Sequence, residues 1–238
     1  MGKSLIIKGA DFSQNGIVPD YIKLDWIGAS NASGKHIASD LYFGNKVGNL
    51  NEELEFCVSL YSSKLNEPET GTCYSMGSGV NTYTNIRVWF MRTATAFYFG
   101  GRPNGSGGIT SVMKQISGVS LWDNQPHVIK INRNGGSYDG NAFTFDAEPT
   151  LEGVDSGSWN NVPIYLDCYS TQGSGNNAIA SETEDAERIH WVKFRRDDSL
   201  ILDEIPVMRT EDEKVGFYDK ITCTYKFRND DSTPAYGA

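Results

Sequence analysis

The chain has 238 residues, of which 39% are hydrophobic and 12% aromatic, so it can bury a core and is not a disordered protein. Its formal net charge of −9 excludes a nucleic-acid binder, because neutralising phosphates requires a basic surface. No stretch approaches the ~18 apolar residues of a membrane-spanning helix, and the opening apolar run is only Leu5, Ile6 and Ile7, so we expect neither a signal peptide nor membrane insertion.

Turn-forming residues are frequent along the whole chain. It contains 25 glycines and 8 prolines, and no window shows a sustained helical stripe. All-β domains of this length often have a single core. We therefore expect an N-terminal attachment arm over residues 1–20, one β-sandwich over 21–229 and a flexible C-terminal tail over 230–238.

Alternation of apolar and polar residues marks the strands, because successive side chains of a strand point to opposite faces. In segment 54–61, for example, Leu54, Phe56 and Val58 share the face that we expect to be buried. The other segments that read as strands are, in chain order, 4–8, 86–91, 96–100, 127–132, 142–146, 164–169, 189–194 and 200–203.

Segment 221–228 alternates most regularly and predicts an antiparallel strand with one side in water. The residues predicted to face inward are Ile221, Cys223, Tyr225 and Phe227, and those predicted to face outward are Thr222, Thr224, Lys226 and Arg228.

Hairpin turns are predicted between several of these strands. Asn134-Gly135-Gly136 and Asp139-Gly140 suit such turns, because Gly, Asn and Asp tolerate positive φ. About a dozen short strands at close spacing predict two antiparallel sheets packed as a sandwich.

Four neighbouring segments near the C-terminus share the order and spacing of a known motif. They are a strand at 189–194, a turn and strand at 195–203, an Ile-Pro-Val-Met-Arg corner at 205–209 and a Gly-Phe-Tyr-Asp turn within 215–219. This order resembles the concanavalin A-like (laminin-G-like) jelly rolls that are common among tailed-bacteriophage structural proteins. Compared with that family, Met208 is an addition and Phe217 replaces leucine.

The resemblance extends to other parts of the chain. Segment 125–134 is similar to the family's hairpin that begins at a histidine, segment 163–166 to its next strand, and segment 3–12 to the start of phage and prophage proteins. In this interpretation Pro206 suits an edge or a corner that needs no ladder donor, and Gly216 suits a turn with an unusual backbone conformation.

Catalytic chemistry is not predicted. Some members of this fold are glycoside hydrolases, which need two acids on one strand face in a cleft. The nearest match, Glu182 to Glu187, has no apolar residues to hold it in a core and is expected to be a solvated loop. We therefore assign no catalytic residue.

No cofactor or metal site is predicted either. The three histidines, His36, His127 and His190, lack the spacing of a metal pair, and calcium has only weak candidate ligands in Asp123, Asp139 and Asn141. The four cysteines are Cys57, Cys73, Cys168 and Cys223; buried free thiols are the favoured interpretation, although an oxidising compartment would allow them to pair.

Sugar binding is suggested by aromatic residues next to polar neighbours, because an aromatic face stacks on a pyranose while amides and carboxylates bind its hydroxyls. The candidates are Trp122, Tyr138, Trp159 and Tyr169.

The resemblance implies a non-enzymatic virion structural protein, such as a head or tail decoration or a fibre element. We expect it to lie on the virion surface, to form homo-oligomers, to contact capsid or tail subunits through the arm residues Leu5, Ile6 and Ile7, and to bind glycans. One alternative is a carbohydrate-binding module of a bacterial surface or secreted protein, and a less favoured one is a glycoside hydrolase.

Overall fold

The computed structural model describes residues 6–7, 20–28, 37, 39, 52–60, 73–78, 87–91, 96–101, 110–115, 123–132, 134–146, 164–165, 187–228 and 230–238. All regular elements in these ranges are strands. They are β1 (Ile6–Ile7), β2 (Tyr21–Lys23), β3 (Trp26–Gly28), β4 (Glu52–Leu60), β5 (Cys73–Ser78), β6 (Arg87–Met91), β7 (Ala96–Gly101), β8 (Thr110–Gln115), β9 (His127–Asn132), β10 (Gly135–Tyr138), β11 (Asn141–Thr144), β12 (Ile164–Tyr165), β13 (Glu187–Arg196), β14 (Ser199–Arg209), β15 (Val215–Asp219), β16 (Thr224–Lys226) and β17 (Tyr236–Gly237).

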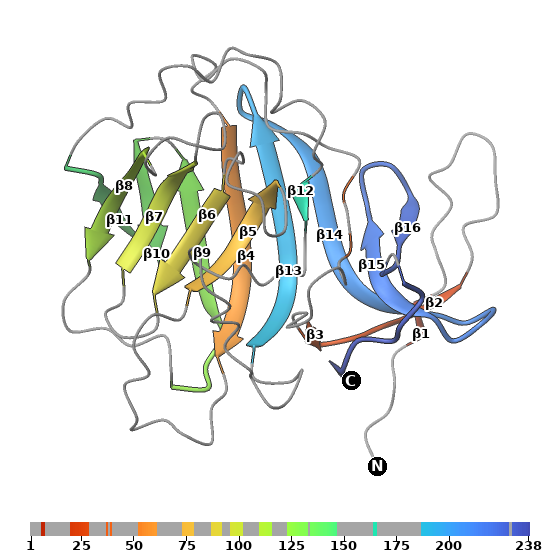
Figure 1. The fold of residues 1–238 in the computed structure, drawn as a ribbon. Helices are drawn as coiled ribbons and strands as arrows, with labels where there is room; N and C mark the ends of the chain where they lie inside the picture. The colour runs from red at the N-terminus through yellow and green to blue at the C-terminus, as the bar shows by residue number, and fades with distance from the viewer. Residues whose placement is uncertain are drawn as a thin grey trace.

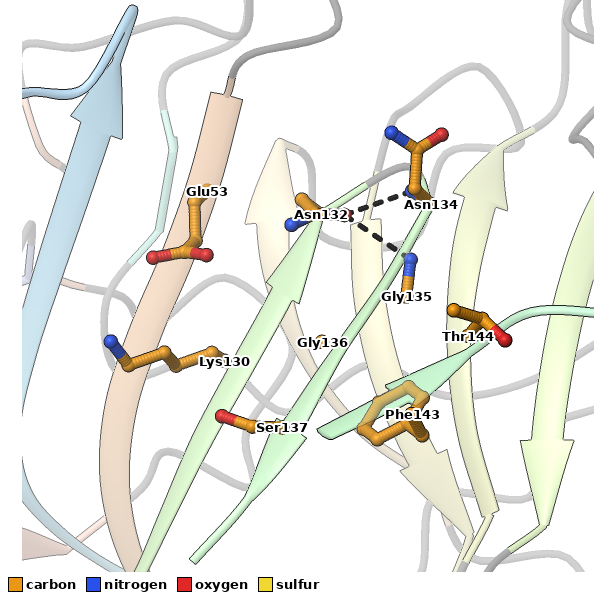
Figure 2. Close-up of a pocket in the computed structure, with 9 residues that line it drawn as sticks. All are labelled: Glu53, Lys130, Asn132, Asn134, Gly135, Gly136, Ser137, Phe143 and Thr144. Atoms are coloured by element: carbon orange, nitrogen blue, oxygen red, sulfur yellow. Dashed lines mark hydrogen bonds between the residues drawn. The ribbon is translucent and has the colours of Figure 1, made fainter. Parts of the chain in front are cut away.

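The strands form two antiparallel sheets that lie face to face. The larger has the order β1-β2-β14-β13-β4-β9-β10-β11, with β15 and β16 beside β14 and with β3 and β17 beside β13. The smaller has the order β12-β5-β6-β7-β8 and lies across β4 and β9 in Figure 1, and on their far side in Figure 2. An ion pair of 2.8 Å between Lys114 Nζ of β8 and Asp146 Oδ1, after β11, connects the layers. The predicted all-β sandwich is confirmed.

The inner face of the larger sheet is the apolar layer of the core. Along β9, buried and half-buried residues alternate over all six positions, and β4 and β13 contribute their apolar residues to the same face. The side chains that are at most 1% exposed here are Leu54, Phe56, Val58, Ile129, Ile131, Ile189, Val192 and Phe194. The alternation predicted for 127–132 is therefore confirmed, and Leu54, Phe56 and Val58 share the buried face as predicted, whereas in 189–194 a register shift between Ile189 and Trp191 interrupts the alternation.

Pro206 lies within a continuous strand and not at the predicted corner. On one side of β14, the last residue opposite β13 is Glu204 and the first opposite β2 is Val207. Pro206 falls between these two neighbours, where its carbonyl accepts a 3.0 Å hydrogen bond from Leu24 N. Proline is tolerated at this position because the N–H group that it lacks falls where the neighbour of β14 changes from β13 to β2.

The predicted facing of segment 221–228 is wrong. The buried Asp219 carboxylate accepts hydrogen bonds from Ile221 N (3.0 Å) and from the Thr222 hydroxyl (2.7 Å), which makes residues 220–223 a turn. The strand begins only at residue 224, and Ile221 is 48% exposed. Lys226 is buried instead, with its Nζ 3.9 Å from Glu204 Oε1.

Arg228, the other residue predicted to face water, is also buried. Its Nη2 atom donates a 3.2 Å hydrogen bond to the carbonyl of Gly28. The strand pattern therefore does not reveal two buried cations, of which one lies near a buried carboxylate and the other donates to a backbone carbonyl.

Both ends of the chain add strands to the larger sheet. The tail predicted to be flexible over 230–238 contains β17, which pairs with β3, and Gly237 O accepts a 2.7 Å hydrogen bond from Asp25 N. Within the predicted arm, Ile6 and Ile7 pair with Ile22 and Tyr21 of the same chain. Leu5 lies outside the described residues.

Gly216 lies in strand β15, not in the predicted turn, and its φ is not positive. It is required for a close approach between strands. A Cβ atom at this position would lie 2.2 Å from Lys226 O of β16, closer than any side-chain carbon can come to a backbone oxygen.

We predict that Gly216→Ala lowers the free energy of unfolding by about 1–3 kcal/mol, because β15 and β16 must separate to admit the methyl group. Chemical denaturation measures the change. Glu211→Ala, in the exposed turn after β14, is the control and should change it by less than about 0.5 kcal/mol. Equal effects of both substitutions would contradict the close approach.

Candidate functional site

An open hollow lies on the outer face of the larger sheet, where β9, β10 and β11 meet (Figure 2). Its volume is ≈ 260 Å³. In the view of Figure 2 the smaller sheet lies behind it, so the hollow faces away from the core. The residues that line it are Glu53, Lys130, Asn132, Asn134, Gly135, Gly136, Ser137, Phe143 and Thr144.

The floor of the hollow is low because β10 has small side chains. Gly135 and Ser137 occupy the positions opposite Asn132 and Lys130 of β9. Both glycines of β10 also lie too close to neighbouring backbone to carry a side chain: a Cβ atom would lie 2.2 Å from Phe143 O at Gly135 and 1.8 Å from Lys130 O at Gly136. The close pairing of three strands therefore excludes bulk at this place.

Asn132 fixes the turn that borders the hollow. Its Oδ1 atom accepts hydrogen bonds from Asn134 N (2.9 Å) and Gly135 N (3.1 Å). Because the Oδ1 atom accepts the hydrogen bonds of the turn, the amide nitrogen of Asn132 lies on the other side, toward Lys130 and Glu53 in Figure 2. Asn132 is therefore a positioned donor.

One aromatic ring and two hydroxyl groups complete the neutral part of the lining. Phe143 is among the lining residues and packs edge to face against Phe145, with ring centroids 5.7 Å apart. The hydroxyl groups of Ser137 and Thr144 can donate and accept. A ligand with both apolar C–H groups and hydroxyls matches this combination.

The charged side of the lining belongs to an ion-pair network. Lys130 Nζ lies 3.6 Å from Glu55 Oε2, and Arg195 Nη1 lies 3.6 Å from Glu53 Oε1 and also contacts Glu55. Lys130, Glu55 and Arg195 come from the adjacent strands β9, β4 and β13, so the register of the sheet brings these charges together.

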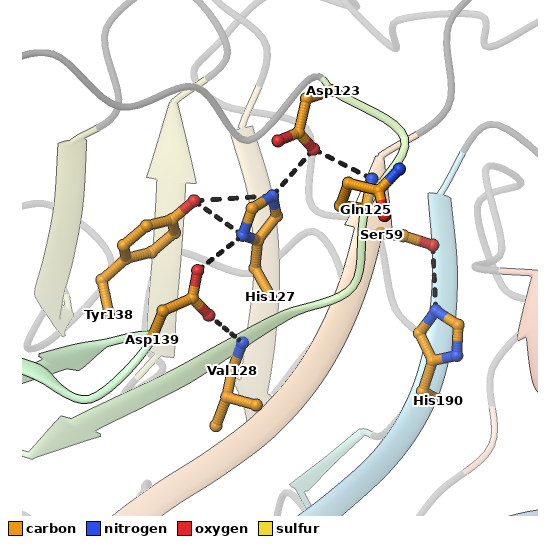
Figure 3. A network of polar contacts seen from close by, with 8 residues as sticks. All are labelled: Ser59, Asp123, Gln125, His127, Val128, Tyr138, Asp139 and His190. Carbon is orange, nitrogen blue, oxygen red and sulfur yellow. Dashed lines mark hydrogen bonds and ion pairs between the residues drawn. The ribbon is translucent and has the colours of Figure 1, made fainter.

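A second polar cluster surrounds His127 on the inner face, at the start of β9 (Figure 3). The His127 side chain is 8% exposed, with Nε2 2.9 Å from Asp123 Oδ1 and Nδ1 2.8 Å from Asp139 Oδ2. A carboxylate only accepts, so the imidazole nitrogen that carries the proton donates to its aspartate. The Tyr138 hydroxyl lies 2.7 Å from Nδ1, and the two rings stack at 5.1 Å.

This cluster holds the β10–β11 hairpin against β9. Asp139 and Gly140 form its turn with φ of 47° and 81°, which confirms the turn predicted at these residues. The backbone N of Asp139 donates to Val128 O at 2.9 Å, and its Oδ1 accepts from Val128 N at 2.8 Å. The cluster thereby fixes the hairpin that carries one wall of the hollow.

Burial and hydrogen bonding shift several acid–base equilibria nearby. For Asp123, burial acts to raise the pKa, but hydrogen bonds from Gln125 N and His127, together with the His127 charge, lower the pKa below 3.8. Burial, and then the charges of Asp139 and Asp123, raise the pKa of Tyr138 above its usual value. The Tyr138 hydroxyl therefore stays protonated at neutral pH.

Two further predicted residues are structural. His190 Nε2 lies 2.9 Å from the Ser59 hydroxyl and Nδ1 lies 2.8 Å from Asp25 O, while burial lowers the pKa of His190 (Figure 3). Burial, and then the Asp139 charge, raise the pKa of the Cys57 thiol to about 12. Cys57 is a buried free thiol and Cys223 a half-buried one, whereas Cys73 has a described backbone only and Cys168 lies outside the described residues.

The predicted sugar-binding aromatics do not line the hollow as far as the structure describes them. Tyr138 is 5% exposed and contacts His127 on the inner face. Trp122, Trp159 and Tyr169 lie outside the described residues. The sequence does contain a signal for the hollow. The outward-facing positions of β9 and β10, considered together, include small residues that leave space on the sheet.

No metal-binding group of at least three His, Cys, Asp or Glu side chains is found in the described part of the chain. The weak calcium candidates Asp123 and Asp139 both contact His127, and Asn141 is exposed at the start of β11. Among the described residues, no helix is long and apolar enough to cross a membrane.

No model of a known protein family matches the chain, and no curated protein matches it. The function of the hollow is therefore inferred from its own residues.

We predict that Asp123→Asn reduces the loss of stability at low pH. A carboxyl group with a depressed folded pKa stabilises the fold above its unfolded pKa, near 3.8, and this contribution disappears as the pH falls through the folded value. The wild-type free energy of unfolding, measured from about pH 5 to about pH 2.5, should fall more steeply than that of the variant. Parallel profiles would contradict the role of the His127 cluster.

Proposed function

We propose that the chain is a non-enzymatic surface protein of a tailed-bacteriophage particle, a concanavalin A-like sandwich of jelly-roll type that binds glycans in the hollow between β9 and β11. The observation that carries the sugar-binding part is the lining of that hollow: a positioned amide donor and two hydroxyl groups on the outward face, with Phe143 also among the lining residues.

The shape and chemistry of the hollow support a sugar as its ligand. Sugars present hydroxyls that donate and accept, and C–H faces that pack on aromatic rings. Ser137, Thr144 and the Asn132 amide supply the polar partners, and Phe143 supplies the ring. The opening toward solvent suits the end of a longer glycan on a cell surface.

The particle-surface part of the proposal is supported by the resemblance of segments 189–219 and 125–134 to phage jelly rolls. The position of β1 is consistent with it. β1 ends the order of the larger sheet within the described part of the chain, so its outer edge offers backbone groups to a strand of a neighbouring capsid or tail subunit, or of a second copy.

The same hollow would serve an alternative, a carbohydrate-binding module of a bacterial surface or secreted protein. The two proposals share the ligand and differ in location, so sugar binding and particle membership need separate tests.

We predict that Ser137→Leu weakens glycan binding by at least about tenfold, because the leucine side chain fills the floor of the hollow. A glycan array identifies a ligand, and titration followed by tryptophan fluorescence measures its affinity. Thr224→Leu adds a leucine at an exposed strand position of β16, outside the hollow, and should bind like the wild type. Unchanged binding by Ser137→Leu would place the site elsewhere.

For the location, we predict that mass spectrometry of purified phage particles from the source culture detects this chain at a fixed ratio to a capsid or tail protein. Particle membership gives a constant ratio through successive purification steps, whereas a bacterial surface protein is lost. Recovery of the chain only from cell envelopes or medium would favour the alternative.

A further inference from the structure

The charged groups beside the hollow balance one another. Two carboxylates of β4, Glu53 and Glu55, face Lys130 of β9 and Arg195 of β13, and each carboxylate has a cation within 4.0 Å. The pairs are Glu53 with Arg195 at 3.6 Å, and Glu55 with both Arg195 and Lys130.

This balance disfavours a ligand that carries its own charge. The Glu55 and Glu53 side chains are only 10% and 25% exposed, so water screens the network incompletely. A carboxylate in the hollow would meet Glu53 and would gain Lys130 only in competition with Glu55. A ligand with a carboxylate would therefore lose its hydration on binding without gaining a cation that is not already paired with a carboxylate of the protein.

The groups left for recognition are neutral. The Asn132 amide and the Ser137 and Thr144 hydroxyls interact with hydroxyls at no electrostatic cost. The volume of ≈ 260 Å³ lies below the roughly 300–1,000 Å³ of pockets that hold drug-sized ligands, which favours one sugar unit over several.

We infer that the hollow binds one terminal, uncharged pyranose and discriminates against the corresponding uronic acid, in which a carboxylate replaces the C6 hydroxymethyl group. This inference rests on the proposed function and names the class of sugar that the site accepts. Glu53 is its specificity-determining residue, because it is the carboxylate that lines the hollow.

The experiment compares oligosaccharides that differ only at their terminal residue: glucose against glucuronic acid, and galactose against galacturonic acid. Titration calorimetry at low salt should show the neutral member of at least one pair binding about tenfold or more tightly than its acid. Raising the salt concentration should narrow the difference, because screening weakens repulsion between charges.

Two isosteric variants distinguish the effect of a charge in the hollow from the effect of the charge of the whole protein. Glu53→Gln removes the carboxylate that lines the site and should reduce the preference for the neutral sugar by about fivefold or more. Glu52→Gln removes the same charge from a separate ion pair of the same strand, with Arg196, outside the lining, and should leave the preference unchanged. Circular dichroism spectra of both variants should match that of the wild type, which checks that the variants fold.

The possible outcomes distinguish a failure of this inference from a failure of the proposed function. Tighter binding of the acids, or equal effects of the two variants, would overturn the selection of uncharged sugars while leaving glycan binding intact. Absence of binding to either member, and to any glycan of the array, would overturn the proposed function itself.

Discussion

The whole arrangement depends on the burial of one face of the larger sheet. Side chains such as Phe56, Ile129 and Phe194, from three adjacent strands, are at most 1% exposed. Because successive residues alternate between faces, this burial fixes the register of β4, β9 and β13 and directs Glu55, Lys130 and Arg195 outward. The ion-pair network of the outer face is thus a consequence of core packing.

The hollow arises from a second constraint, the tight pairing of β10 with its neighbours. Gly135 and Gly136 cannot carry a side chain without meeting backbone atoms, so the sheet lacks bulk between β9 and β11. On the opposite face, Asp123, His127 and Asp139 hold the same hairpin. A rigid support behind a depression with polar walls is the arrangement that a pre-organised binding site requires.

The sequence predicted the all-β sandwich and most of its strands, because the alternation of Leu54 to Val58 and of segment 127–132 follows directly from burial. It misjudged segment 221–228, because the turn made by Asp219 and the buried position of Lys226 depend on partners distant in the chain. The hollow was not predicted for the same reason: its lining combines β4 with β9 to β11, and register sets that combination.

We propose that the outward face at β9 to β11 binds a sugar. The most direct measurement is a titration of the isotope-labelled protein with a neutral oligosaccharide, followed by amide nuclear magnetic resonance. We predict that the largest shifts cluster at Asn132, Ser137 and Thr144, with small changes around the turn at 220–223. Saturable shifts confined to other parts of the molecule, or no shifts with any sugar that the protein retains on an array, would contradict it.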